Sequence, residues 1–157
     1  MTVTRRAVAE DSPFEVDILG GSPLWKGHEE GLAKALAAAA TAQGVSGTVS
    51  LLLGDDATIA GLNKEFRDKE GPTNVLSFPP ADGAEPGFLG DIALAAETIV
   101  EEAQFQGKRF DNHAAHLVVH GFLHLLGFDH MNDADAEAME ARERAILASM
   151  GIEDPYA

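Results

Sequence analysis

Histidine recurs every four residues at His116, His120 and His124, and His130 follows six residues later. Residues four apart share one face of a helix, so neighbouring members of this row can bind one metal ion. All three cannot, because His116 and His124 lie about 12 Å apart along a helix axis, whereas zinc binds nitrogen at about 2.0–2.1 Å. Gly127 permits a left-handed residue that ends the helix and returns His130 to the same face. The sequence therefore predicts a metal site formed by His120, His124 and His130.

This predicted site lacks the general base of a zinc peptidase. Peptidases with the motif H-E-x-x-H-x-x-G-x-x-H keep a glutamate directly after the first histidine, whereas this chain has Gly121 there. Three neutral imidazoles leave zinc one open position, and a water bound there is acidified toward about pH 7. Two routes remain for its proton. One is Asp129, the nearest carboxylate in the sequence, and the other is an anionic substrate such as a phosphodiester.

A phosphodiester substrate also requires a cation near phosphorus. Arg67 follows an apolar helix face and begins a loop, which suits a guanidinium that projects into a cleft. The alternative is that Arg67 only complements the dipole of the helix end. His116 also has two interpretations, as a buried residue one turn behind the site or as a contact to substrate. His28 and His113 are expected at the surface.

Composition limits the classes of function. The chain has 157 residues, of which 45% are hydrophobic, and this predicts one domain over residues 1–157 with a single core. The chain contains no cysteine, so the ligands of a metal ion must be nitrogen or oxygen atoms. The net charge of −15 argues against tight non-specific binding to nucleic acid. The acidic segment Asp133–Glu143 is interpreted as a solvated helix face.

No targeting or membrane segment is expected. Arg5 and Arg6 are not followed by the apolar run of a signal peptide, and no stretch of the chain is long and apolar enough to cross a bilayer. These features predict a cytoplasmic protein.

Apolar periodicity and turn residues predict an α+β domain with a small mixed sheet of about four strands and about five helices. The predicted strands are 14–19, 48–53, 74–78 and 90–95. The predicted helices are 24–43, a helix capped by Asp55 and Asp56 that ends near Arg67, and 97–106, 112–126 and 133–150. Residues 1–12 are a candidate flexible tail. The zinc site is expected where the fourth of these helices turns.

Four segments together resemble the YbeY family of bacterial endoribonucleases and ribosomal RNA maturation factors. They are LNKEFRDKEGPTNVLSFP from Leu62, LGDIALA from Leu89, HLVVHGFLHLLGFDH from His116, and AEAMEARERAIL after it. The similarity covers about residues 55–150, and the first third of the chain is less diagnostic. The motif H-x3-H-x5-H is short, and the TNVLSF block adds specificity to it.

The resemblance implies hydrolysis of single-stranded RNA in maturation of the 3′ end of 16S ribosomal RNA and in ribosome quality control. It implies one zinc ion per chain on His120, His124 and His130, and it places the active-site arginine at Arg67. Arg67 and His116 are the candidates for contact with RNA. The resemblance also suggests a small-subunit ribosomal protein and an Era-type GTPase as partners. Two alternatives stay open: a metallopeptidase-like zinc hydrolase, and a non-catalytic ribosome-assembly factor with a structural metal.

Overall fold

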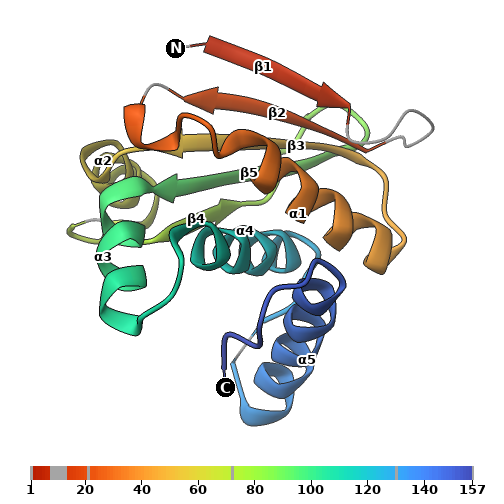
Figure 1. Ribbon diagram of the computed structural model, residues 1–157. Coiled ribbons are helices and arrows are strands. Elements are labelled where there is room, and N and C mark those ends of the chain that lie inside the picture. Colours follow the sequence, from red (N-terminus) through yellow and green to blue (C-terminus); the bar gives the residue numbers. More distant parts are fainter. Residues whose placement is uncertain (1, 8–13, 21, 72, 130, 157) are drawn as a thin grey trace.

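One mixed β-sheet forms the centre of the molecule (Figure 1). The computed structural model describes residues 2–7, 14–20, 22–71, 73–129 and 131–156. The strands lie in the order β1-β2-β3-β5-β4. Their bounds are β1 (Thr2–Ala7), β2 (Phe14–Gly20), β3 (Gly47–Gly54), β4 (Val75–Phe78) and β5 (Phe88–Ala95). β2, β3 and β5 are parallel, and β1 and β4 pair antiparallel at the two edges.

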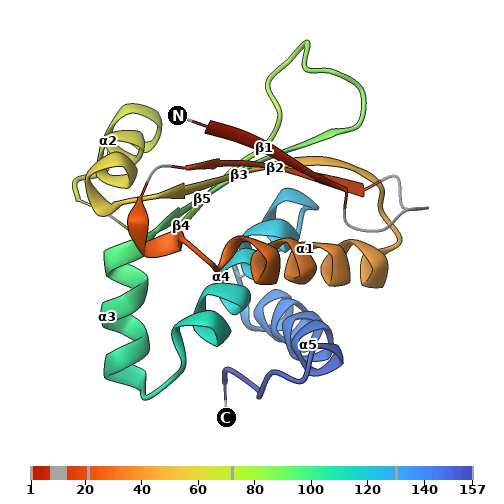
Figure 2. The same cartoon turned by 45° about the horizontal axis from the view of Figure 1, so that its top comes forward.

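Helices cover the two faces of the sheet unequally. They are the short 3-10 helix η1 (Pro23–Trp25), α1 (Glu29–Gln43), α2 (Asp56–Arg67), α3 (Ala96–Gln106), α4 (Phe110–Leu125) and α5 (Asp133–Ser149). Figure 2 shows α1, α3, α4 and α5 on the lower side of the sheet and α2 on the upper side. Alternate residues of β2, namely Phe14, Val16 and Ile18, are buried in the large core on the lower side. A smaller cluster that includes Ile59 and Leu76 lies under α2.

Local sequence signals set several helix ends. Gly44 adopts the left-handed conformation that ends α1, and the Asp55 side chain caps α2 by accepting a hydrogen bond from the Thr58 amide at 2.8 Å. α1 begins at Glu29, five residues later than predicted. The chain first makes η1 and then turns at Gly27, whose φ of 88° is incompatible with a continuous α-helix.

The prediction of an α+β domain with five α-helices is confirmed, but the sheet has five strands where about four were expected. The additional strand, β1, lies within the segment taken as a candidate flexible tail. β1 has no apolar alternation of its own and is defined by its pairing with β2, from Thr2 opposite Gly20 to Ala7 opposite Glu15. Periodicity within one segment cannot reveal such an edge strand. In the described part of the chain no helix is long and apolar enough to cross a membrane.

Candidate metal and active site

The histidine row lies on α4, and the face of α4 that carries Gly121 is packed tightly against the sheet. A Cβ atom at Gly121 would lie 2.9 Å from the Ser77 Oγ and 3.2 Å from carbon atoms of Val75 and Ile92. The Ser77 hydroxyl also donates a hydrogen bond to the Gly121 carbonyl at 2.9 Å. A glutamate at this position would meet strands β4 and β5 without room for its side chain. The base that a zinc peptidase keeps there is therefore excluded by packing.

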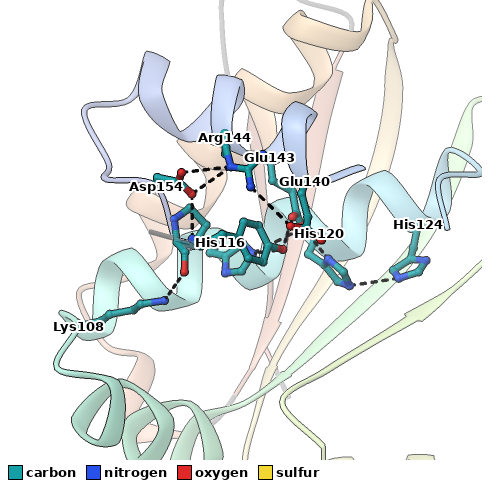
Figure 3. Close-up of polar contacts among 10 residues, drawn as sticks. Lys108, His116, His120, His124, Glu140, Glu143, Arg144 and Asp154 are labelled. Atoms are coloured by element: carbon teal, nitrogen blue, oxygen red, sulfur yellow. Dashed lines mark hydrogen bonds and ion pairs between the residues drawn. The ribbon is translucent and has the colours of Figure 1, made fainter. Parts of the chain in front are cut away.

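His120 and His124 direct the same ring nitrogen toward each other. Their Nε2 atoms are 3.2 Å apart (Figure 3). Two nitrogens bound to one tetrahedral zinc ion would be about 3.3 Å apart, given bonds of about 2.0–2.1 Å. The rings are therefore arranged as neighbouring ligands of one metal ion are, and the i, i+4 spacing on α4 is what brings them together.

α4 ends at a turn that matches the predicted role of Gly127. The Phe128 amide donates to the Leu123 carbonyl and the Gly127 amide donates to the His124 carbonyl, which together form a Schellman motif. Gly127 has a φ of 100°, as this motif requires of its left-handed residue. The turn reverses the chain immediately after His124. His130 itself lies outside the described residues, and among those described no three histidine, aspartate or glutamate side chains form a group that could bind a metal ion.

A buried carboxylate on α5 orients His120. Glu143 is 0% exposed, and its Oε1 accepts a hydrogen bond from His120 Nδ1 at 2.5 Å. Burial alone would raise the pKa of Glu143, but hydrogen bonds with His116, His120 and Tyr156 outweigh burial and lower the pKa to about 2. An ionised Glu143 can only accept, so the proton of His120 resides on Nδ1 and Nε2 is left with a lone pair. This is the tautomer that binds a metal through Nε2.

Glu143 corrects the interpretation of the acidic segment Asp133–Glu143 as a solvated face. The acidic residues at its beginning are exposed, but Glu143 is not. It lies four residues after Met139 and three and four residues before Ile146 and Leu147, which are all buried. The spacing of these apolar residues places Glu143 on the buried face of α5. This signal was present in the sequence and outweighs the charge of the segment.

Arg67 and the two histidines line one cleft of about 500 Å³. Its lining residues are Arg67, Asn74, Val75, Ser77, Pro79, His120, His124, Leu125 and Asp129. Arg67 is the last residue of α2, because Asp68 takes the left-handed conformation and turns the chain. The cleft thus combines one guanidinium, two imidazoles and one carboxylate from segments far apart in the sequence.

Two asparagines, neither of them a predicted site residue, hold the Arg67 side of the cleft; Asn63 is buried and Asn74 is partly exposed. Asn63 donates from its side-chain amide to the Gly71 carbonyl at 2.9 Å and so fixes the loop that follows Arg67. Asn74, at the cleft wall, donates to Glu102 on α3 at 3.0 Å. Nothing near Asn74 in the sequence indicates its partner on α3.

The other histidines of α4 lie outside this cleft. His116 is close to Tyr156, with 3.2 Å between its Nε2 and the hydroxyl oxygen, and it lines a separate cleft of about 280 Å³ beside the C-terminal segment. His113 was expected at the surface, but it is 5% exposed and is hydrogen-bonded to Glu102 at 2.9 Å. Burial lowers the pKa of His113 more than Glu102 raises it. His28, expected at the surface, is partly exposed and contacts Asp111.

The family profile and the similar sequences found by comparison carry the same description. A sequence profile described as Endoribonuclease YbeY matches residues 24–151. Proteins named Endoribonuclease YbeY from Parvibaculum lavamentivorans and Azorhizobium caulinodans are each 48% identical to the chain over 92% of its length, which covers 86% and 97% of those proteins. One from Rhizobium etli is 58% identical over 69% of this chain and 66% of its own. A solution structure of a Thermotoga maritima protein has the same fold, with a TM-score of 0.55 and 24% identity over 87% of this chain and 91% of that chain.

Proposed function

Because this chain belongs to the YbeY family of endoribonucleases, we propose that it is a metal-dependent endoribonuclease that cleaves single-stranded RNA. The observation that carries this proposal is the cleft shared by Arg67, His120 and His124. In the proposed reaction, a metal ion activates the water that attacks the phosphodiester, and a second cation stabilises the charge that develops on the phosphate oxygens. This cleft contains two candidate metal ligands and one guanidinium.

His120 and His124, with His130, are proposed to hold one zinc ion, and the described pair fits such an ion in spacing and tautomer. When bound, zinc would supply a Lewis acid and lower the pKa of a water molecule. Nitrogen ligands suit zinc, and the absence of cysteine from the chain is consistent with an all-histidine site.

The remaining cleft residues are assigned roles by their chemistry. Arg67 would bind the non-bridging oxygens of the phosphate with its planar fork and stabilise the charge that develops on them. Asp129 lines the same cleft and is the carboxylate placed to accept a proton. His116 lies outside the cleft, which argues against its alternative role as a contact to RNA.

The finer assignments follow from the family. We propose that the substrate is ribosomal RNA, cleaved at the 3′ end of the 16S molecule and during ribosome quality control. A small-subunit ribosomal protein and an Era-type GTPase are the proposed partners, and the cytoplasm is the proposed compartment. A partner that delivers the RNA would compensate for a net charge of −15, which opposes unassisted binding.

The direct test is cleavage of a single-stranded RNA and of a duplex with the same sequence by zinc-loaded protein. We expect cleavage of the single strand only, and we expect His124→Ala to lose both zinc and cleavage. His28→Ala is the matched control, because His28 pairs with Asp111 away from the cleft, and it should retain both. Protein that binds zinc but leaves RNA intact would refute the nuclease and favour a ribosome-assembly factor with a structural metal.

A further inference from the structure

The C-terminal segment, residues 150–156, contacts His116 and Glu143, which lie next to His120 of the predicted metal site. After α5, polar contacts hold the chain beside α4, and Figure 3 shows Asp154 with Arg144 and the position of Lys108. Arg144 donates to Asp154 at 3.1 Å, and Lys108 donates to the Pro155 carbonyl at 2.9 Å. The Tyr156 hydroxyl donates to Glu143 through a short hydrogen bond. Of these contacts, only that of Tyr156 reaches the carboxylate that orients His120.

The Tyr156 hydroxyl has one proton, which it donates to Glu143 Oε2, while His120 Nδ1 donates to Glu143 Oε1. The two donors therefore occupy the two oxygens of one buried carboxylate. With both donors in place, Glu143 is 0% exposed. Tyr156 thus restricts how Glu143 turns, and Glu143 restricts how the His120 ring turns.

The same hydroxyl acts with Glu143 on the tautomer of His116. The proton of the hydroxyl is directed to Glu143, so toward His116 the hydroxyl can only accept, and Glu143 Oε1 lies 3.6 Å from the same His116 Nε2. Both neighbours therefore favour a proton on Nε2 of His116. The other ring nitrogen, Nδ1, is buried without a hydrogen-bond partner. Neither nitrogen of His116 is therefore available to a metal ion. His120 lies four residues from both His116 and His124, so spacing alone does not choose between them. Because the nitrogens of His116 are not available, His124 is the partner of His120 at the metal.

We propose that Tyr156 is a positioning residue that selects the chelating pair in the histidine row. Its hydroxyl holds Glu143 against His120 and, together with Glu143, keeps the Nε2 proton on His116, so that His120 and His124 bind the metal. This inference rests on the proposed role of His120 as a metal ligand. It adds to that role a residue from the end of the chain that touches neither metal nor RNA.

The test is Tyr156→Phe, which removes one oxygen atom and keeps the ring. We expect zinc to bind roughly 10- to 100-fold more weakly, the usual effect of removing a group that supports a metal ligand. The visible spectrum of cobalt-substituted protein should change as well, because it reports ligand geometry. Lys108→Met is the control, since it removes another anchor of the C-terminal segment without touching Glu143. An equal loss of zinc affinity in Lys108→Met would overturn the role of the hydroxyl.

A second measurement does not depend on a bound metal. Nitrogen NMR of the metal-free wild type should show His116 protonated on Nε2 and His120 protonated on Nδ1. Tyr156→Phe should weaken this preference at His116, where only Glu143 then remains as an acceptor. A wild type with His116 protonated on Nδ1 would overturn the proposal. If instead His120→Ala binds zinc as tightly as wild type, the proposed metal site fails. If His120→Ala loses zinc but Tyr156→Phe does not, only the role of Tyr156 fails.

Discussion

The two halves of the histidine row on α4 have different surroundings. His113 is buried against Glu102, and His116 is hydrogen-bonded to the C-terminal segment. His120 and His124 face each other at the wall of the cleft that contains Arg67. The helix presents the same residue type at spacings of three or four in both halves. In the closed half, formed by His113 and His116, Nε2 is occupied by Glu102 of α3 or by Tyr156 of the C-terminal segment. In the open half, formed by His120 and His124, Glu143 of α5 occupies Nδ1 of His120 and the two Nε2 atoms converge.

The largest expected effect concerns the open half and its cation. Arg67→Ala should lower the turnover of RNA cleavage by roughly 10²–10³, as removal of one preorganised donor does, because the phosphate loses its stabilising charge. Zinc content should not change, because the proposed zinc site does not depend on any contact of Arg67. Turnover should be measured at saturating RNA, because weak binding would otherwise obscure it.

Arg67→Lys is the matched variant for this effect. It keeps the charge but replaces the planar fork by a point charge, so we expect it to recover only a small part of the activity. Wild-type turnover in Arg67→Ala, together with inactivity of His124→Ala, would leave a metal-dependent enzyme without the proposed phosphate contact.

The next effect concerns Glu143, which stands between the two halves. Glu143→Gln removes the charge that favours the Nδ1 proton of His120 while it keeps an oxygen acceptor. We expect zinc affinity to fall by roughly 10- to 100-fold, measured by competition with a chelator. Arg67 should be unaffected, so turnover at saturating zinc should fall less than in Arg67→Ala. An unchanged zinc affinity would show that the ring of His120 is held by packing alone.

How far the sequence predicted this site depends on the distance between its parts along the chain. His120, His124 and Gly127 lie within one helix and its end, so helical geometry and glycine conformation sufficed to predict their arrangement. The partners of the row come from elsewhere: Glu102 from α3, and Glu143 and Tyr156 from α5 and the segment after it. Those contacts depend on how helices pack, which one segment does not specify.

The same distinction explains the errors. His113 was expected at the surface, but the packing of α3 against α4 buries it and supplies Glu102. Strand β1 was missed because its pairing with β2 defines it. Glu143 lies between these two cases. The spacing of the buried apolar residues of α5 indicated that Glu143 is buried, but its charge led to the opposite prediction.

A smaller effect is expected at the turn that ends the open half. An added side chain at Gly127 would meet no atom within 4 Å, so strain and not a clash would be its cost. The φ of 100° should cost a β-branched residue about 1–2 kcal/mol. Gly127→Val should therefore weaken zinc binding if relaxation of the turn displaces His130. Equal zinc affinity in Gly127→Val and wild type would contradict the role of this turn in placing the third ligand.

The smallest effect tests the closed half through its pH dependence. Burial lowers the pKa of His113 from its usual value of 6.5, so the folded protein resists a proton that the unfolded chain accepts. The contribution of a neutral His113 to stability is present above pH 6.5 and is lost as pH falls below this value. The slope for one such group reaches at most about 1.4 kcal/mol per pH unit.

Metal-free protein in a chelator isolates this contribution, because ligand protonation then adds nothing through zinc. Denaturant unfolding between about pH 7 and pH 5 should show a steeper loss of stability for wild type than for His113→Gln, which retains a polar group near Glu102 but does not titrate. The other histidines are common to both proteins, so their titration cancels in the difference apart from the electrostatic coupling of His116 to His113. Parallel pH profiles would mean that folded His113 accepts its proton as readily as the unfolded chain does. The hydrogen bond with Glu102 would then offset burial, and the closed half would differ from the open half in its partners but not in its resistance to charge.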